Sequence, residues 1–345
     1  MTLLDTIKYS IKHTIASILF YTGILFVIKT FKLRNKLVIL MYHRVLDHNE
    51  KLATFSHPGI CVDKDTFEQQ LLFLKKHFRI LPEDDFLEHL EEGISFHSPS
   101  CLITFDDGWL DNYTNAFPLL KENNIPATIF LATDYIGTGK TFWQEKIAAE
   151  LFDLLRRGDK SATSILEHYA LGEVADLPRW QAKIKIREFI SKQKHLESSE
   201  LFGFIDDFSK ASSSASNTDQ HVDSFLDWNK VREMAENNIS FGSHSVHHYI
   251  LTNIPHETAA TEIRDSQKAV EKGAGRSPKL FCYPNGDFSA EIAEEVRAAG
   301  YLAALSTRQG YLDNRSDRFS LPRINIHNGT SNSIPLFMMR ILDLF

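Results

Sequence analysis

Two adjacent carboxylates, Asp106 and Asp107, directly follow an apolar run at residues 101–105 (CLITF) and precede Gly108, which permits a sharp turn. Charge is costly at such a place, and the carboxyl ends of strands form the active face of α/β sheets and barrels. An isolated Asp-Asp pair more often caps the next helix and faces solvent. The pair therefore indicates a site only if matching chemistry follows other strands.

A group of histidines supplies such chemistry. Residues 244–248 read HSVHH and directly follow the apolar run ISFGS at 239–243. Two imidazoles at positions i and i+4 converge if the segment turns helically, so His244 and His248 are the better pair and His247 is the weaker candidate. Two histidines and one carboxylate suit a divalent first-row metal with open positions for water and substrate.

A third run ends in the turn Tyr283-Pro284-Asn285-Gly286. A Pro-x-Gly sequence can be merely a turn. Its functional interpretation is that a backbone N–H group, that of Asn285, faces the metal and holds a developing oxyanion.

Seven short runs rich in β-branched and aromatic residues alternate with helix-like stretches, which is typical of buried parallel strands. They lie at 37–42, 101–105, 127–132, 239–243, 280–284, 301–305 and 321–326. Sequential βα units of one hand close into a barrel or wind into an open sheet. The fold class is therefore α/β, and the alternation alone does not choose between the two forms.

Residues 142–226 interrupt this alternation with helical patterns and then the polar run SKASSSASNTDQ at 209–220. We predict a helical insertion ending in a flexible linker. The strands then belong to one catalytic domain made of residues 37–141 and 227–330. Residues 331–345 are predicted to form a C-terminal helix that docks on it.

The composition excludes several classes of protein. The chain has 345 residues, 43% of them hydrophobic, which is enough for one large core, and its net charge is −7. Without a basic field, nucleic acid is not an expected partner. The three cysteines, Cys61, Cys101 and Cys282, show no C-x-x-C spacing. We interpret them as buried core residues and not as disulfides or zinc ligands.

The N-terminal segment 1–36 is unusually apolar. Residues 14–28 carry no charge and are flanked by basic residues, but a transmembrane helix needs about 20 apolar residues. Three interpretations stay open, namely an uncleaved anchor, an in-plane helix with cationic rims, and a helix packed on the core. We predict membrane association from the uninterrupted apolar run and its basic flanks. If the segment spans, the greater cationic density after the run favours a cytoplasmic catalytic part, and without attachment the protein is expected in the cytoplasm.

The motifs TFDDG at 104–108, HSVHH at 244–248 and YPNG at 283–286 resemble the signature of the polysaccharide deacetylase (NodB-homology) family. The segment LMYHRV at 40–45, Asp-Trp at 227–228 and LPRI at 321–324 resemble the branch that acts on bacterial exopolysaccharides. The resemblance covers roughly residues 37–326 apart from the insertion. It implies a distorted (β/α) barrel of seven parallel strands and removal of N-acetyl groups from an amino-sugar polysaccharide or glycan precursor.

The resemblance also implies roles for individual residues. Asp107, His244 and His248 become the metal ligands, and Asp106 becomes the general base that acts on the metal-activated water. The expected ion is Zn²⁺, with Co²⁺, Ni²⁺ and Fe²⁺ as alternatives. The partner is an N-acetylated glycan, and the oligomeric state is not indicated. Three aromatic residues near the motifs are candidate substrate contacts: Tyr283, Trp109 and Trp228.

Two departures from the family pattern concern catalysis. Many members carry an arginine that orients the base in the motif that here reads FCYPNG, and Arg323 in the last strand is the candidate replacement. Many members also end with a Leu-x-His motif whose histidine protonates the leaving amine. Here the candidates for that proton donor are His327 and His43.

Two other functions compete with this one. A non-haem iron oxygenase also uses two histidines and one carboxylate, but its usual HxD spacing is missing and Asp106 has no task in that chemistry. A catalytically impaired carbohydrate-binding or assembly protein of the same fold is the second alternative. The intact Asp-Asp pair and the paired histidines argue against it.

Overall fold

The computed structural model describes residues 3–93, 98–158, 160–193, 196, 198–212 and 223–344. The predicted linker at 209–220 lies mostly outside these residues. The chain divides into two compact units. The first comprises Met1–Lys51, Pro58–Thr138 and Phe225–Phe345, and the second comprises Leu52–His57 and Gly139–Ser224.

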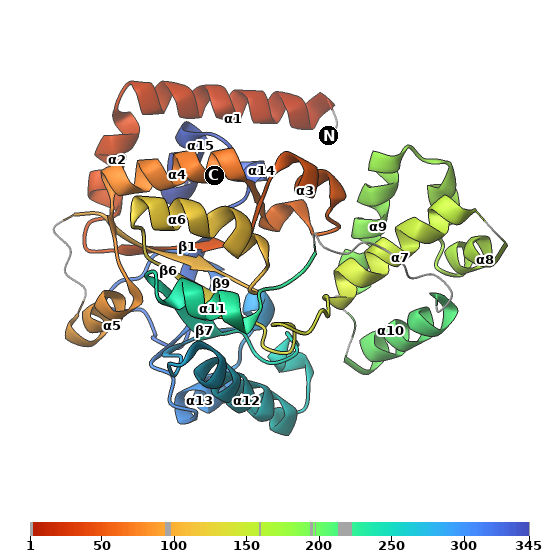
Figure 1. Ribbon diagram of the computed structural model, residues 1–345. Helices are drawn as coiled ribbons and strands as arrows, with labels where there is room; N and C mark the ends of the chain where they lie inside the picture. The colour runs from red at the N-terminus through yellow and green to blue at the C-terminus, as the bar shows by residue number, and fades with distance from the viewer. Residues whose placement is uncertain are drawn as a thin grey trace. The chain divides into compact units, whose positions relative to one another are not determined.

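A closed barrel of seven parallel strands forms the centre of the first unit (Figure 1). Its strands are β1 (Leu37–Tyr42), β5 (Ser100–Phe105), β6 (Ala127–Leu131), β7 (Ile239–Ser243), β8 (Leu280–Cys282), β9 (Ala303–Gln309) and β10 (Leu321–Asn325). The order around the barrel is β1-β10-β9-β8-β7-β6-β5, and β5 pairs back with β1. All seven predicted runs are thus confirmed as strands, and they form a barrel and not an open sheet.

Three shorter strands accompany the barrel. The two-residue strand β4 (Arg79–Ile80) pairs with the start of β5, and β2 (Arg44–Leu46) pairs in parallel with β3 (Cys61–Asp63). Strand β2 begins just after the carboxyl end of β1, so the small sheet of β2 and β3 lies next to the candidate site.

Apolar side chains fill the inside of the barrel. Leu37, Ile39, Leu102, Phe130, Leu280, Leu305 and Leu321 belong to one buried cluster. Helix α5 (Glu83–Glu92) contributes Phe86 and Leu87 to the same cluster. At Gly242 an added Cβ would lie 2.5 Å from the Phe130 ring and 2.8 Å from the Leu280 carbonyl oxygen, so glycine is required there.

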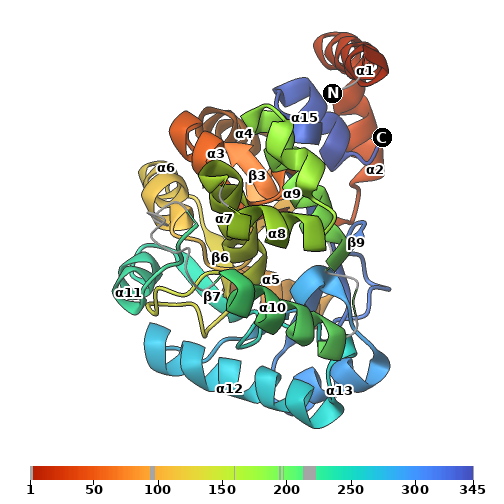
Figure 2. The same ribbon diagram turned by 90° about the vertical axis from the view of Figure 1, so that its right-hand side faces the viewer.

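Helices surround the barrel (Figures 1 and 2). They are α3 (His48–Ala53), α4 (Lys64–His77), α6 (Phe117–Asn123), α11 (Trp228–Ala235), α12 (His256–Ala274), α13 (Ala290–Ala298), α14 (Asn328–Ser331) and α15 (Ile334–Ile341). The longer helices bury apolar side chains on one face, as Phe67, Leu71 and Leu74 of α4 do.

The N-terminal segment forms two helices and not one. Helix α1 (Leu3–Tyr21) and helix α2 (Ile24–Lys32) meet at Gly23, whose φ of 80° breaks the helical path. Among the described residues, no single helix is long and apolar enough to cross a bilayer. The stretches Ile7–Tyr21 and Ile24–Lys32 pass that test only as a pair, bent by 83°.

The second unit is helical. It contains α7 (Trp143–Arg157), α8 (Lys160–His168), α9 (Arg179–Gln193) and α10 (Ser198–Ser212). These helices pack around Ile147, Leu151, Leu166, Ile186 and Phe208, which gives the unit a core of its own.

Candidate metal and catalytic site

The segments that follow β5, β7 and β8 have unusual backbone conformations. Four residues other than glycine lie in the left-handed region: Asp107 (φ 77°), Ser245 (φ 61°), His248 (φ 57°) and Asn285 (φ 58°). Each costs about 1–2 kcal/mol relative to a right-handed conformation. Such strained residues gather at functional sites, where the surrounding structure holds them. An added Cβ at Gly108 would also lie 2.7 Å from Leu131, so the turn after the paired carboxylates requires glycine.

Asp107, His244 and His248 converge at the carboxyl end of the barrel. The Oδ1 atom of Asp107 lies 3.4 Å from Nε2 of His244 and 3.3 Å from Nε2 of His248. Ligands about 2.0–2.1 Å from a tetrahedral ion are separated by roughly 3.3–3.4 Å, so these atoms fit a shared metal. Nδ1 of His244 lies 2.7 Å from the Cys282 carbonyl oxygen, which leaves the Nε2 lone pair for the ion.

Trp109 orients the aspartate of this triad. Its indole Nε1–H donates to Oδ2 of Asp107 at 2.8 Å, which leaves Oδ1 facing the histidines. The indole is fully buried, stacked on Phe225 and covered by the Arg44 guanidinium, each about 4.3 Å from the ring. Arg44 in turn donates to Asp111 at 2.9 Å. Trp109 was predicted to contact the sugar, but because it is buried we assign it the role of orienting Asp107.

Glu262 holds the histidine loop from outside the barrel. This carboxylate of α12 is 4% exposed and accepts the backbone N–H groups of Val246 and His247 at 2.9 and 2.8 Å. It also lies 2.5 Å from Nδ1 of His247. His247 is therefore engaged by Glu262, and among the described residues the group around Asp107 comprises only His244 and His248.

Asp106 forms its closest ion pair with Arg323. The guanidinium reaches from β10 and donates to both carboxylate oxygens at 2.7 Å. Burial by itself raises the pKa of Asp106, but the charge and hydrogen bonds of Arg323 outweigh it and hold this pKa below its usual value. Asp106 is thus an ionised carboxylate beside the triad, as a general base must be.

A second group, Asp106, His244 and Cys282, also brings three metal-binding atoms together. Its atoms are already engaged, because Arg323 occupies both oxygens of Asp106 and also donates to the Cys282 sulfur at 3.0 Å. Burial also raises the pKa of the Cys282 thiol, which disfavours the thiolate that a metal needs. The Asp107 group is the better metal site.

The structure treats the two candidate proton donors differently. Nε2 of His43 lies 3.8 Å from Oδ2 of Asp106, and its ring is 15% exposed. Burial lowers the pKa of His43, while Asp106 and Asp107 oppose this effect. His327 immediately follows Ile326, whose N–H bonds to the Met41 carbonyl, so it lies beyond the paired ends of β10 and β1. His43 is the candidate that lies close to Asp106.

The remaining predicted residues lie in different surroundings. Asn285 follows β8 in a tight turn, and its side-chain Nδ2 donates to Asp287 at 2.6 Å. Tyr283 is fully buried and donates its hydroxyl to the Phe319 carbonyl at 2.9 Å, which does not support a sugar contact. Trp228 packs its ring directly against Gly273, between α11 and α12, which also indicates a structural role.

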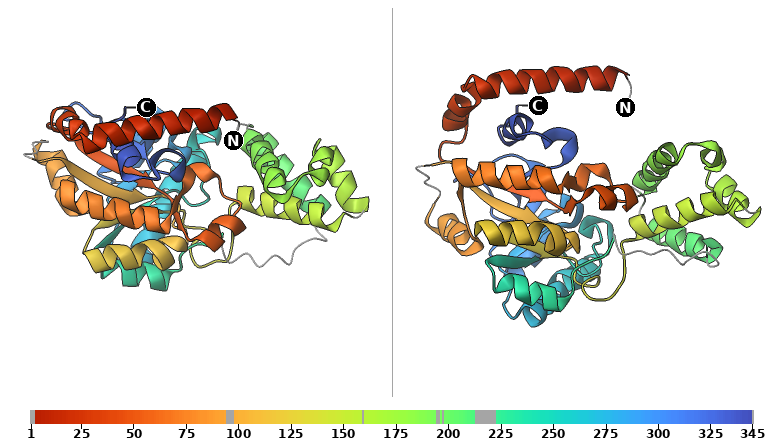
Figure 3. Two further views of the ribbon diagram at one scale, coloured as in Figure 1. Left: turned by 90° about the horizontal axis from the view of Figure 1, so that it is seen from above. Right: turned by 45° about the horizontal axis from the view of Figure 1, so that its top comes forward.

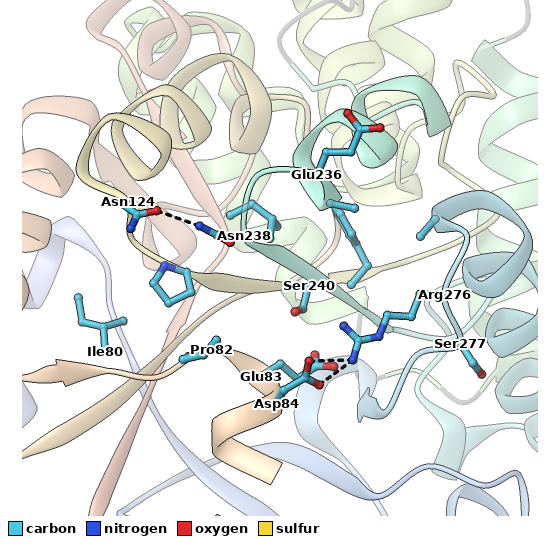
Figure 4. Close-up of a pocket in the computed structure, with 15 residues that line it drawn as sticks. Ile80, Pro82, Glu83, Asp84, Asn124, Glu236, Asn238, Ser240, Arg276 and Ser277 are labelled. Atoms are coloured by element: carbon cyan, nitrogen blue, oxygen red, sulfur yellow. Dashed lines mark hydrogen bonds and ion pairs between the residues drawn. The ribbon is translucent and has the colours of Figure 1, made fainter. Parts of the chain in front are cut away.

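A cavity of about 490 Å³ lies at the opposite, amino end of the barrel (Figure 4). Ile80, Pro82, Glu83, Ser240 and Arg276 are among the residues that line it. The cavity holds none of the residues of the candidate site, which follow the carboxyl ends of the strands. Its size alone gives it no part in the chemistry described above.

The sequence pattern of one family, polysaccharide deacetylase, matches residues 94–196 and 205–304. The chain is 21% identical over 299 residues to the Bacillus subtilis protein YxkH, covering 86% of this chain and 74% of that one, and YxkH is assigned to the same family by name. It is also 34% identical over 118 residues to a poly-β-1,6-N-acetyl-D-glucosamine N-deacetylase of Staphylococcus epidermidis. That match covers 30% of this chain and 39% of the relative.

Solved structures show the same fold. The Streptococcus pyogenes deacetylase PplD, in complex with acetate, aligns with a TM-score of 0.57 at 20% identity and covers 88% of this chain and 98% of its own. IcaB from Ammonifex degensii aligns with a TM-score of 0.56 at 18% identity, covering 89% and 97%. Together with the family match over more than half of the residues, this places the chain in the polysaccharide deacetylase family.

Proposed function

We propose that this protein is a metal-dependent N-deacetylase that removes acetyl groups from an amino-sugar polysaccharide. One observation carries the proposal. The triad Asp107, His244 and His248 converges at distances that fit a shared ion, and the Arg323-paired carboxylate of Asp106 lies directly beside it. A metal with a separate carboxylate base is the arrangement that amide hydrolysis by an activated water requires.

The residues of the chain divide the work. Asp107, His244 and His248 would hold the ion, and Trp109 engages Oδ2 of Asp107 so that Oδ1 is left on the side of the histidines. When bound, a divalent ion supplies Lewis acidity that makes water nucleophilic near neutral pH and polarises the amide carbonyl. Asp106 accepts the proton of the attacking water, and Arg323 keeps this carboxylate ionised and oriented.

The acid half of the reaction needs a second proton transfer. We propose that His43 takes part in it, because its Nε2 lies 3.8 Å from Oδ2 of Asp106, the proposed base. The backbone N–H of Asn285 is proposed to donate to the oxyanion, as the position of its turn after β8 suggests. The products are acetate and a free amine on the sugar.

N-acetylglucosamine polymers are the proposed substrate class. Support comes from the staphylococcal relatives, whose names state N-deacetylation of poly-β-1,6-N-acetyl-D-glucosamine. The hydrophilic acetamide and the polymeric form are shared by other glycans, so the linkage is the property to test. Zn²⁺ is the proposed ion, since two imidazoles and one carboxylate with open positions are a ligand set of catalytic zinc sites.

The test is release of acetate from β-1,6- and β-1,4-linked N-acetylglucosamine oligomers. The chelator-treated protein should be inactive, and Zn²⁺ or Co²⁺ should restore release from the β-1,6-linked series. Preference for the β-1,4 series would show that the proposed linkage is wrong, while the proposed N-deacetylation would still hold. The protein is instead a binding module of this fold if it binds an acetylated glycan but releases no acetate from any glycan with Zn²⁺, Co²⁺, Ni²⁺ or Fe²⁺.

A further inference from the structure

Exposed apolar side chains are concentrated in one part of the molecule. Of the fourteen large apolar side chains that are exposed within the described residues, eight lie between Ile7 and Phe31. Five of them form what we call the outer face of α1: Ile7, Ile11, Ile15, Ile18 and Tyr21. Their spacing of three to four residues places them in one stripe along the helix.

The opposite face of α1 is already docked. The hydroxyl of Tyr9 donates to Oδ1 of Asn332 at 2.7 Å, Ala16 is fully buried, and the Phe20 ring lies 6.2 Å from that of Phe73. Figures 1 and 3 show α1 outermost in its unit, with α15 beneath it. The outer face is therefore not needed to attach α1, and a helix at a water-facing surface would carry polar residues there.

Charge distinguishes this segment from the remainder of the protein. Residues 1–36 hold six basic residues and one acidic residue, a net charge of +5, whereas the whole chain carries −7. Lys8 and Lys12 are exposed beside the apolar stripe of α1, and Arg34 is exposed just beyond α2. An apolar stripe with a cationic rim complements a surface with an apolar interior and anionic head groups.

Hydrogen bonds to the barrel unit argue against a crossing of the bilayer. In α2, Lys29 donates to the His77 carbonyl at 3.2 Å and Lys32 donates to the Asp343 carbonyl at 3.0 Å. Extending the bent pair across a membrane would break these contacts and that of Tyr9 with Asn332. A helix lying in the surface keeps all of them.

We propose that the outer face of α1 inserts into the surface of an anionic lipid bilayer, with the helix parallel to the membrane plane. The protein is then monotopic, and one of the three interpretations of the N-terminal segment is selected. This proposal is independent of the deacetylase chemistry. Attachment on the cytoplasmic side stays a prediction, because an in-plane helix does not itself fix the side.

Vesicle binding by the full chain tests the proposal. Phosphatidylcholine vesicles containing about a third phosphatidylglycerol should bind the protein, and pure phosphatidylcholine vesicles should bind it much more weakly. The double variant Ile11→Gln/Ile18→Gln should bind the anionic vesicles at least about tenfold more weakly. Lys8→Gln/Lys12→Gln should reduce the preference for anionic lipid.

The matched control is Leu302→Gln, which replaces an apolar residue of similar exposure, 41%, outside α1 and α2. It should bind the anionic vesicles as the unaltered protein does. If the protein binds neither the anionic vesicles nor the pure phosphatidylcholine vesicles, the proposal is overturned. So does self-association in solution that disappears in Ile11→Gln/Ile18→Gln, because the outer face would then be a contact between two copies.

The depth of the helix separates insertion from spanning. The native cysteines are buried, so a nitroxide on Ile18→Cys reports from one position. An in-plane helix places the label about 5–10 Å into the boundary between head groups and acyl chains. A spanning pair would place it near the centre, about 15 Å deep, and this result would refute the in-plane assignment.

Discussion

The two ends of the barrel each bury a carboxylate, and the two carboxylates have opposite electrostatic surroundings. At the carboxyl end Arg323 grips Asp106 through two hydrogen bonds. At the amino end Glu83 is 4% exposed, and Thr128 contacts it at 3.4 Å. Arg276 and Lys279 lie nearby, but both are bound by Asp84. The Arg276 pair measures 2.6 Å (Figure 4) and the Lys279 pair 2.7 Å.

The difference appears in the protonation of the two groups. Arg323 overcomes the effect of burial and keeps the pKa of Asp106 low, whereas burial raises the pKa of Glu83 to about 7. Burial without a directly bound cation therefore shifts a carboxyl group towards its protonated form near neutral pH. A base that works at that pH requires the guanidinium as well.

Replacing each carboxylate by its amide gives the largest contrast. Asp106→Asn should lower kcat about 10²–10⁴-fold, because the proton acceptor of the reaction is lost. Glu83→Gln is the matched control at the other end of the same barrel and should leave kcat unchanged. Acetate release measures both. Comparable losses in the two variants would mean that Asp106 acts through folding and not through catalysis.

Removing the arginine should make the carboxyl end resemble the amino end. Arg323→Met leaves a buried carboxylate without its partner, which costs about 3–5 kcal/mol of stability in urea unfolding. The pKa of Asp106 should then rise. Because the base acts when ionised, the rise of kcat/KM with pH should occur at higher pH than in the unaltered protein.

Arg323→Lys keeps a positive charge but loses the bidentate contact with the Asp106 carboxylate. It should restore part of the stability and move the acidic limb of the pH profile only partway. An unchanged limb in Arg323→Met would show that Asp106 is not the titrating base.

Glu83 should make the protein less stable as pH rises. Its pKa is raised from 4.5 to about 7 on folding, so between these values the unfolded chain releases a proton that the folded protein retains. Stability is then lost through this window, by about 3 kcal/mol at most. Thermal unfolding from pH 4 to pH 8 should show this loss, and Glu83→Gln should abolish it.

Trp109→Phe should have the smallest effect of the four, confined to the carboxyl end. It removes the hydrogen bond to Asp107 but keeps the stacking, and support residues of this kind change metal affinity about 10–100-fold. Competition with a chelator measures the affinity. Trp228→Phe, a tryptophan packed between helices, should leave it unchanged.

The strands were predictable because each buried parallel strand is a local apolar run. The prediction was less accurate where the pattern is not apolar. The last three residues of β9, up to Gln309, are exposed and polar, so the run at 301–305 stopped short of them. Closure of the barrel depends on the pairing of β1 with β10, which no local pattern encodes.

The site was predictable in its residue types and less so in its supports. Chain neighbours such as Asp106 and Asp107 are visible as a pair, but residue type does not reveal which face Trp109 or Tyr283 occupies. Glu262 was missed because it lies in a helix, with nothing in its local sequence to connect it to the histidine loop. The break at Gly23 was missed because one glycine within an apolar run is a weak signal.

The contact between Asp106 and Arg323 spans 217 residues of sequence. The ribosome therefore synthesises the residues of the proposed metal triad and the insertion before it adds Arg323, which keeps the proposed base ionised. During synthesis, the nascent chain should remain without hydrolytic activity until β10 has joined β1. The same closure that seals the barrel would then be the step that switches on the enzyme.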